Sequence, residues 1–347
     1  MSSIQFGMYT PFYPMDLIIR VAEATARYDY DSIWAGDHLA GFPSPHVYDA
    51  WSELLYFATM NKKLKLGMSV SDPHRRHPAV MAQTITTIDI LSNGRVIPGF
   101  GPGEAMNLDP YGIDWSHPVA KLKEYIIVMK RLWEGRSLNF QGKYFRINGG
   151  ILVPEPIQKP CPPVWVAANS PRALKVTAEV GDGWLPLAES PEGYKRNLTI
   201  IKDHARNVGR SEDAILPALF LYTAVAKEHE TARRMAEPVT KIALVWFSHK
   251  LRQLGYNYSF GDLEIKHVTV TPENLQETAK ASEKIPSEVV AKVCAFGTPD
   301  ECISKIEEFA KAGARHIVLV PLVPPEAWEE NVNLFGKKVI PYFKELR

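Results

Sequence analysis

Three strand-like segments of this chain each run directly into a loop of polar, ionisable or glycine residues. They are residues 31–36 before Asp37 and His38, residues 64–70 before the loop 71–77, and residues 95–100 before the loop 101–104. In a barrel of alternating strands and helices, the strand ends on one side all open onto one pocket. The pattern therefore predicts one active site that is assembled from loops far apart in the sequence.

The rest of the chain continues the alternation of strands and helices. Strand-like segments cover residues 4–8, 32–35, 64–70, 96–100, 164–168, 183–186, 214–226 and 316–321. Helical spacing of apolar residues covers residues 15–28, 51–60, 78–91, 118–133, 171–180, 194–208, 228–251 and 299–312. This order predicts an α/β fold in which residues 1–347 form a single (β/α)8 TIM barrel with a closed parallel sheet.

Two segments depart from the alternation of strands and helices. Residues 140–147 have the pattern of a small hairpin, with Gln141 and Gly142 near its turn. Residues 251–285 carry no strand signal of the barrel type and are too long for an ordinary connection. We expect this second segment to be an insertion that packs over the carboxyl ends of the strands.

Composition excludes several classes of partner. The formal net charge of +1 gives no electrostatic reason to expect nucleic acid or an anionic membrane surface. No apolar run is long enough for a membrane span, and the first strand starts where a signal peptide would lie. Cys161, Cys294 and Cys302 form no CxxC pair. We therefore expect a cytoplasmic protein with no disulfide framework and no metal site.

Asp37 and His38 are the first candidates for chemistry. An imidazole can donate a hydrogen bond or a proton near neutral pH, and an adjacent carboxylate could fix its tautomer. Glu104 follows the glycine-rich turn 99–103 and is a second candidate acid, base or hydrogen-bond anchor, with Asn107 near enough to join it. The glycines allow close approach of a ligand to the backbone. Alternatively, His38 is an ordinary hydrogen-bonded loop residue, Asp37 is a cap, and the glycines form only a tight turn.

Other loops carry residues that are suited to binding. Arg75 and Arg76, which histidines flank, could hold phosphate or carboxylate groups, or they could belong to an exposed basic loop. The aromatic segment 41–48 could line an apolar pocket or pack in the core. Small residues at 167–168 leave room for a flat ring, while Ser170 can cap the helix that follows.

Taken in order, these blocks resemble the luciferase-like superfamily of flavin and deazaflavin barrel enzymes over nearly the whole chain. The blocks that carry the resemblance are Trp34–His38, Asp72–Gln83, Gly94–Glu104 and Phe296–Glu301. Within the superfamily, the chain is most similar to enzymes that use coenzyme F-420, a deazaflavin, which include methylenetetrahydromethanopterin reductases and phthiodiolone ketoreductases. Residues 109–115 and 165–168 are most similar to the ketoreductase branch. The resemblance implies hydride transfer between the deazaflavin and a carbonyl, alcohol or methylene-tetrahydropterin substrate.

The resemblance also implies roles for individual residues. His38 and Glu104 match the catalytic positions of the family. Cofactor-binding residues are expected at Asp37, Ser69, Val70, Gly101, Gly103, Asn107, Ala167, Ala168 and Asn169. In this group a non-proline cis peptide bond after strand three supports the deazaflavin ring, and the matching bond here joins Ser69 to Val70.

Other positions bear on the cofactor tail and on the substrate. Basic candidates for holding the anionic tail are Arg75, Arg76, Lys241, Lys250 and Arg252. The sugar-phosphate dehydrogenase branch has a glutamate near the first strand end, whereas residues 9–13 contain none, and its late phosphate-binding arginine falls near Val293. These departures argue against glucose 6-phosphate. We expect a small-molecule substrate and, because relatives commonly associate, a homo-oligomer such as a dimer.

Three functions remain open at this point. The first is an F-420-dependent oxidoreductase, the second is an FMN-dependent monooxygenase on the same barrel, and the third is a non-enzymatic member that only binds a ligand or partner. Deazaflavins carry carbon where flavins carry nitrogen, so they pass hydrides but do not readily activate oxygen. Anaerobic turnover therefore separates the first function from the second, and the presence of His38 and Glu104 argues against the third.

Overall fold

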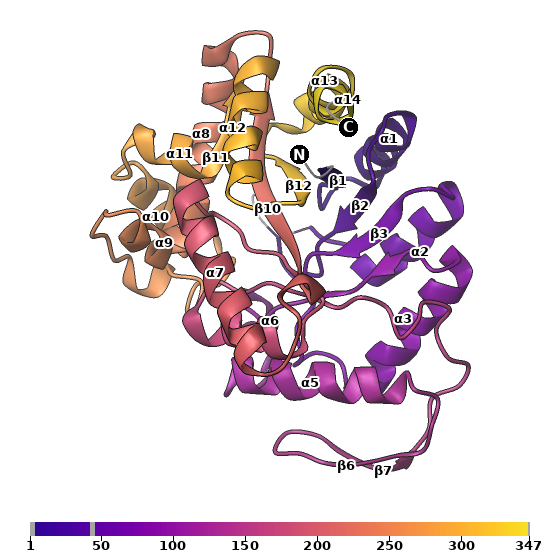
Figure 1. The fold of residues 1–347 in the computed structure, drawn as a ribbon. Helices are drawn as coiled ribbons and strands as arrows, with labels where there is room; N and C mark the ends of the chain where they lie inside the picture. Colours follow the sequence, from indigo (N-terminus) through magenta and orange to yellow (C-terminus); the bar gives the residue numbers. More distant parts are fainter. Residues whose placement is uncertain (1–3, 42–45, 346–347) are drawn as a thin grey trace.

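The computed structural model describes residues 4–41 and 46–345, in which a parallel sheet closes into a barrel (Figure 1). The sheet strands are β1 (Gln5–Tyr9), β2 (Ser32–Ala35), β3 (Lys65–Met68), β4 (Val96–Ile97), β5 (Gly99–Phe100), β8 (Trp165–Val166), β9 (Gly183–Trp184), β10 (Leu216–Val225), β11 (Cys294–Gly297) and β12 (His316–Pro321). Their spatial order is β4-β3-β2-β1-β12-β10-β9-β8-β5, with β11 beside β10. Only Pro98 separates β4 from β5, so the path returns to its start and the expected barrel is confirmed.

Helices connect the strands and surround the barrel. They are α1 (Met15–Arg27), α2 (Ala50–Met60), α3 (Pro78–Ser92), α4 (Ala105–Leu108), α5 (Pro118–Leu132), α6 (Pro171–Val180), α7 (Pro191–Asn207), α8 (His229–Trp246), α9 (Ser248–Gln253), α10 (Pro272–Ser282), α11 (Ser287–Val293), α12 (Pro299–Lys311), α13 (Trp328–Leu334) and α14 (Ile340–Glu345). Side-chain caps at Asp49, Ser170, Ser190 and Thr298 fix where four of them begin. None of the described helices has the length and apolarity needed to cross a bilayer.

Large side chains fill the lower part of the barrel interior. The rings of Trp34 and Trp165 lie 4.9 Å apart, and His316 at the start of β12 lies 5.1 Å from Trp165. Ser32 Oγ lies 2.8 Å from His316 Nε2 and accepts a hydrogen bond from Trp34 Nε1. Burial lowers the pKa of His316 to about 3, so this imidazole is a neutral core group. The carboxyl ends of the strands are therefore the end at which a ligand can enter.

One strand of the sheet departs from the sequence-based expectation. β11 pairs in parallel with the second half of β10, with Cys294 opposite Tyr222, whereas β9 pairs only with the first residues of β10. β11 follows α11 directly and has only four residues, so no apolar alternation distinguishes it from the helices on either side. The strand lengthens the barrel wall beside the carboxyl half of β10.

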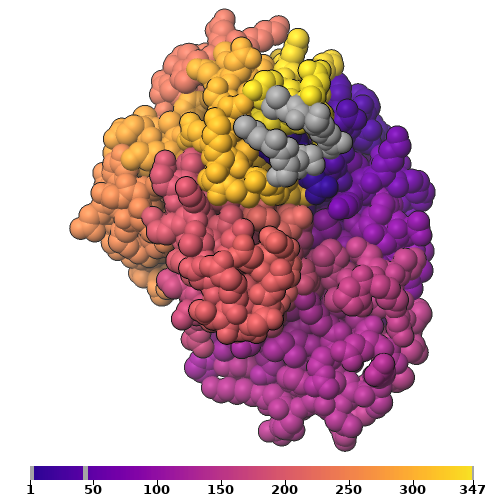
Figure 2. Space-filling view, in the orientation of Figure 1, coloured from indigo at the N-terminus to yellow at the C-terminus, as the bar shows by residue number. Residues whose placement is uncertain are grey.

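The segment between β10 and β11 bulges from one side of the barrel, on the left in Figures 1 and 2. The single helix expected over residues 228–251 is broken at Phe247 into α8 and α9. The backbone nitrogen of Ala105 lies 3.4 Å from the carbonyl of Ile265, and the nitrogen of Ile265 donates to Trp246 O at 2.9 Å. The insertion therefore contacts the first residue of α4, which follows the glycine-rich turn.

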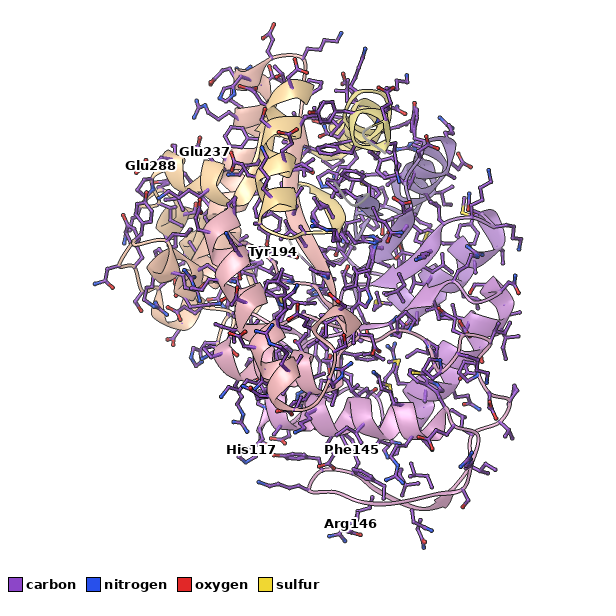
Figure 3. The ribbon with its side chains drawn as sticks, viewed as in Figure 1. His117, Phe145, Arg146, Tyr194, Glu237 and Glu288 are labelled. Atoms are coloured by element: carbon purple, nitrogen blue, oxygen red, sulfur yellow. The ribbon has the colours of Figure 1, made fainter. Side chains whose placement is uncertain are left out.

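A second projection is the hairpin of β6 (Leu138–Gln141) and β7 (Arg146–Gly150), which is longer than the expected 140–147. Phe145 holds this arm against α5, with its ring 5.7 Å from that of Tyr125. Figure 3 shows Arg146 directed away from the body of the protein. In Figure 1 the arm lies outside the barrel, below α5.

Candidate active site

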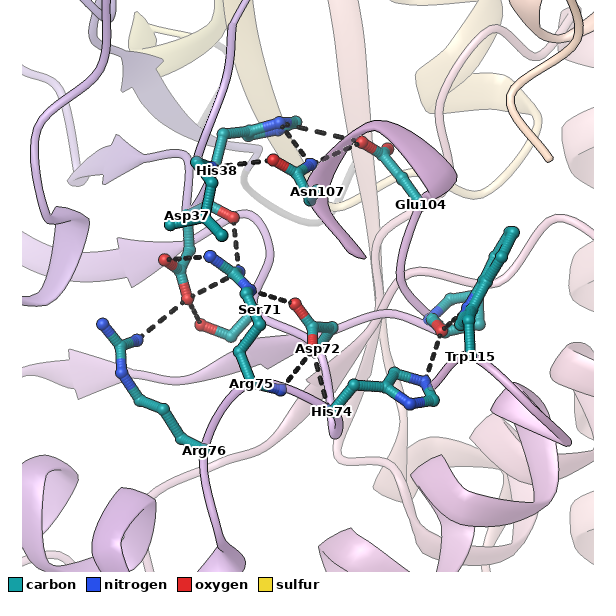
Figure 4. A network of polar contacts seen from close by, with 12 residues as sticks. Asp37, His38, Ser71, Asp72, His74, Arg75, Arg76, Glu104, Asn107 and Trp115 are labelled. Carbon is teal, nitrogen blue, oxygen red and sulfur yellow. Dashed lines mark hydrogen bonds and ion pairs between the residues drawn. The ribbon is translucent and has the colours of Figure 1, made fainter. Parts of the chain in front are cut away.

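His38 lies directly beyond β2 and is oriented by Asn107. Asn107 Oδ1 accepts hydrogen bonds from the backbone nitrogens of Leu39 at 2.7 Å and Ala40 at 3.3 Å. These two contacts fix the amide so that its Nδ2 points at His38 Nδ1, 2.9 Å away (Figure 4). Because an amide nitrogen can only donate, His38 Nδ1 accepts, and a neutral His38 carries its proton on Nε2.

Glu104 completes this cluster from the other side. It occupies the position before α4, and its Oε2 accepts from Asn107 Nδ2 at 3.2 Å and lies 3.7 Å from His38 Nδ1. The side chains of His38 and Glu104 are 21% and 29% exposed, so both remain accessible to a ligand. The structure thus brings together the two residues expected to be catalytic, through an asparagine expected to belong to the cofactor shell.

Asp37 points the opposite way from His38, into a buried ionic network. Its carboxylate is 4% exposed, accepts a hydrogen bond from Ser71 Oγ at 2.5 Å, and contacts Arg75 and Arg76 at 3.1 Å each (Figure 4). Arg75 is also paired with Asp72, at 2.5 Å. The network joins the loops after β2 and β3, so in this structure Asp37 and both arginines bind one another.

The loop after β3 packs against the glycine-rich turn. The peptide bond between Ser69 and Val70 is cis, as the resemblance implied. A Cβ added at Gly101 would lie 2.8 Å from Val70 Cγ2, and one at Gly99 would lie 2.0 Å from Met68 O. Only glycine permits this approach. Ser69 Oγ is buried, and among the described residues it has no hydrogen-bond partner.

The carbonyl of Pro102, in the glycine-rich turn, is held by two side chains. Trp115 Nε1 donates to it at 2.7 Å, and His74 Nε2 lies 3.1 Å from it (Figure 4). Burial is the main cause that lowers the pKa of His74. Gly103, with φ of +92°, then reverses the chain toward Glu104. No sequence motif predicted these roles for His74 and Trp115.

Three cofactor-binding residues are expected after β8, and one of them lies next to the glycine-rich turn. Ala167 is nearest, because its Cβ lies 3.6 Å from the position of a Cβ at Gly101. The carbonyl of Ala168 accepts from Trp184 Nε1 at 3.0 Å, and Asn169 Oδ1 lies 3.4 Å from Leu187 N. Ala168 therefore binds β9, and Asn169 contacts the segment that follows β9. Ser170 caps α6, as expected.

Aromatic side chains that no sequence motif indicated surround the mouth. Tyr9 at the end of β1 lies 5.1 Å from Phe220 of β10, ring to ring, and Phe12 lies 5.0 Å from His38. Tyr222 projects to the same face of β10 as Phe220, because the two are two residues apart in one strand. Burial, and then the charge of Glu104, raises the pKa of the Tyr222 phenol, which stays protonated.

Part of the expected aromatic segment forms the outer rim of the mouth. Tyr13 stacks on His46 at 4.7 Å and on Tyr48 at 6.1 Å. Residues 42–45 of the expected segment 41–48 lie outside the described residues. Trp51 is buried and donates to Ser71 Oγ at 2.9 Å. It therefore holds the serine that donates to Asp37.

The basic candidates for the cofactor tail in the insertion region are each bound to other groups. Lys241 pairs with Glu237 at 2.6 Å, and the buried Lys250 pairs with the buried Glu189. Arg252 donates to Tyr258 O at 2.9 Å. A tail-binding role for any of them therefore stays a prediction, and it would require exchange of these contacts.

The chain is similar to several known proteins over most of its length. The chain is 29% identical to a phthiodiolone/phenolphthiodiolone dimycocerosates ketoreductase of Mycobacterium tuberculosis, covering 91% of this chain and 90% of that protein. It is 26% identical to a 5,10-methylenetetrahydromethanopterin reductase of Archaeoglobus fulgidus, covering 98% and 99%. Its fold matches an F-420-dependent secondary alcohol dehydrogenase in complex with an F-420–acetone adduct, with a TM-score of 0.82 and 22% identity over 97% and 98% of the two chains.

The same fold also occurs in solved structures of monooxygenases, one of them in complex with FMN. A family model described as luciferase-like monooxygenase matches residues 4–316, which include every described strand of the barrel apart from β12, of which only the first residue is matched. The chain therefore belongs to the luciferase-like monooxygenase family.

Proposed function

We propose that this protein is an F-420-dependent oxidoreductase that transfers a hydride between the deazaflavin and a carbonyl, alcohol or methylene-tetrahydropterin carbon. The observation that carries the proposal is the partly exposed cluster of His38, Asn107 and Glu104 beside Val70 and the glycine-rich turn. Relatives that match most of the chain are named as a ketoreductase and a methylenetetrahydromethanopterin reductase, and both names describe reduction at carbon.

The residues next to this cluster fit a flat redox ring. Gly99 and Gly101 keep the turn close to Val70, which leaves backbone rather than bulky side chains at this wall. The buried hydroxyl of Ser69 has no partner among the described residues, and a ring with polar edges could provide one. A reduced deazaflavin bound there would supply a hydride to a substrate carbon stacked about 3–3.5 Å away.

Carbonyl reduction adds a hydride to carbon and a proton to oxygen, and the cluster can serve the oxygen. Since Asn107 engages Nδ1, the Nε2–H of His38 is the donor that can stabilise the developing alkoxide. Glu104, whose side chain lies 3.7 Å from His38, is the second candidate for delivering the proton. The aromatic side chains of Tyr9 and Phe12 help to exclude water.

The alternative is an FMN-dependent monooxygenase, because monooxygenases share the fold. The test uses purified protein under anaerobic conditions with reduced F-420 and a panel of ketones and methylene-tetrahydropterins, and with oxidised F-420 and secondary alcohols. A parallel sample with FMN is followed by oxygen uptake. F-420 turnover without oxygen supports the proposal, whereas FMN-dependent oxygen uptake without F-420 turnover contradicts it.

A matched pair of histidine variants ties any activity to the cluster. His38→Leu is expected to lower kcat by about 100-fold, since it removes an oriented donor to the substrate oxygen. His204→Leu is the control, because His204 is also 21% exposed and also contacts a carboxylate, Glu179 at 3.0 Å, on the outer helices. Equal losses in both variants would contradict the assignment of His38.

We further propose that the protein acts in the cytoplasm on a small molecule and as a homo-oligomer. Val80 and Leu91 on the outer face of α3 are 54% and 57% exposed, which is the kind of surface that a second copy could cover. Sedimentation equilibrium tests this assembly, and a monomer at every concentration would contradict it.

A further inference from the structure

Three adjacent strands of the barrel, β1, β12 and β10, direct aromatic and aliphatic side chains into its interior. His316, at the start of β12, contacts Ser32 and Trp165 inside the barrel. Paired residues of a parallel ladder project to the same face, so positions in register with His316, and those two and four residues further along each strand, also face inward. The last of these positions before the carboxyl ends, here called the aromatic arc, are Tyr9, Phe220, Tyr222, Val318 and Val320.

The rings of the aromatic arc contact one another and reach the catalytic cluster. The ring of Phe220 lies 5.1 Å from that of Tyr9 and 6.3 Å from that of Tyr222. Phe12, in the loop after β1, lies 6.0 Å from Tyr9 and 5.0 Å from His38, ring to ring. A molecule whose carbonyl lies beside His38 can therefore extend its other atoms past Phe12 onto the arc.

The strands opposite the arc carry small residues at the corresponding positions. When β4 and β5 are counted as one interrupted strand, three strands separate it from β12 in either direction around the barrel. Trp165 of β8 faces inward in register with Gly99 of β5, so the next inward positions are Ala167 and Gly101. With the deazaflavin of the proposed function on this side, a substrate that stacks on its ring lies between the ring and the aromatic arc.

The side chains of the aromatic arc carry no charge and few polar atoms. Their polar atoms are the hydroxyls of Tyr9 and Tyr222, and the first of these is turned toward Gly36, where a Cβ would lie 2.2 Å from it. A carboxylate or phosphate on this surface would lose its water without gaining a cation. A pterin ring has amino and amide groups that would need more partners than two hydroxyls supply. Apolar carbon, in contrast, is stabilised by contact with the arc.

We propose that the aromatic arc binds the body of the substrate, and that this substrate is an uncharged ketone with an apolar chain or ring, or the matching secondary alcohol in the reverse direction. This inference rests on the proposed function. In the reduction, a hydride from the reduced deazaflavin forms the new C–H bond, and the π electron pair of the carbonyl moves to oxygen, which takes a proton. The products are the secondary alcohol and oxidised deazaflavin. The arc takes no part in these steps and determines which substrate is accepted.

The first test compares matched substrates with the full-length protein and reduced F-420 under anaerobic conditions. Each methylene that the arc covers should raise kcat/KM by up to about fourfold, so 2-octanone should exceed acetone by about 100-fold. The compound 7-oxooctanoate has a carboxylate in place of the terminal methyl group of 2-octanone. Its kcat/KM should be at least about tenfold lower than that of 2-octanone. A 5,10-methylene-tetrahydropterin should give no turnover.

The second test measures binding without turnover. Isothermal titration calorimetry follows 2-octanone added to protein that is loaded with oxidised F-420, because these two cannot react. Burial of the chain on the arc should give a negative heat-capacity change. Phe220→Ala should weaken this binding by about tenfold and lower the ratio of kcat/KM between 2-octanone and acetone by a similar factor. Phe140→Ala is the control, because Phe140 is also partly buried but lies in the arm of β6 and β7, outside the barrel.

The outcomes separate the inference from the proposed function. Turnover of 7-oxooctanoate or of the pterin that equals turnover of 2-octanone overturns the inference and leaves the proposed function in place. Absence of 2-octanone binding, or equal ratios in Phe220→Ala and Phe140→Ala, also overturns it. The comparison of substrates in the wild type decides the matter if Phe220→Ala fails to fold. Absence of F-420 binding by the wild type, measured by quenching of F-420 fluorescence, instead refutes the proposed function.

Discussion

Replacing Glu53 by glutamine is expected to change how the stability of the protein depends on pH. Burial raises the pKa of Glu53 in the folded protein from 4.5 to about 7. Between these values the folded state holds a proton that the unfolded state has released, so the free energy of unfolding falls as pH rises from about 4.5 to about 7. Above that range Glu53 is ionised in both states, so the free energy of unfolding no longer changes with pH through this group.

The size of this effect follows from the difference between the pKa values of Glu53 in the unfolded and folded states. Each pKa unit corresponds to about 1.4 kcal/mol, so the wild type should lose about 2.5 kcal/mol between pH 5 and pH 8 through Glu53 alone. For a chain of 347 residues, whose unfolding entropy is about 2.1 cal/mol/K per residue, this corresponds to about 3 °C in Tm. A glutamine side chain cannot ionise, so in the Glu53→Gln variant this contribution vanishes.

The assay is thermal unfolding of the wild type and of Glu53→Gln at pH 5 and pH 8, followed by circular dichroism. Other groups titrate equally in both proteins, so the difference between their two Tm changes isolates Glu53. The variant should lose about 3 °C less than the wild type. Equal losses, or a larger loss in the variant, would show that the Glu53 carboxyl is ionised in the folded protein at pH 5 and would refute the reasoning.

Three further substitutions probe the site. Asn107→Leu should lower kcat by about tenfold to 100-fold with little effect on KM, because His38 loses the group that fixes its tautomer, and steady-state kinetics measures this. Gly101→Ala should weaken cofactor affinity, measured by fluorescence titration, more than it lowers Tm, since the added Cβ would push Val70 out of place. Asp37→Ala removes one of the two carboxylates that contact each of Arg75 and Arg76, which keep Asp72 and Asp49, and should destabilise the protein by about 1.5–3 kcal/mol in urea unfolding; unchanged stability would contradict the network.

The residues that could be predicted from the sequence are those that follow a recognisable strand. His38, Val70 and Glu104 come directly after the segments with the clearest strand pattern, and the barrel topology then brings those ends together. Asn107 was expected because it lies within one turn of Glu104, and the structure places it between Glu104 and His38. Local pattern and fold therefore identify this half of the site.

The other half lay in segments that look like ordinary core. Tyr9 and Tyr222 lie in buried strands, so neither spacing nor composition marks them. Which carboxylate binds which arginine is also a property of three-dimensional packing. Asp37 is next to His38 in sequence, yet its side chain bonds to the loop after β3. The direction of a side chain at a strand end is therefore not predictable from adjacency.

The central claim is that the carboxyl ends of these strands hold a flat deazaflavin ring against the Ser69–Val70 peptide and beside His38 and Glu104. A crystal structure of the protein soaked with F-420 tests this claim most directly. We predict that the ring contacts Val70 and Gly101, with the edge that exchanges hydride turned toward His38. A ring bound at any other place, or no bound F-420 at saturating concentration, would contradict the account.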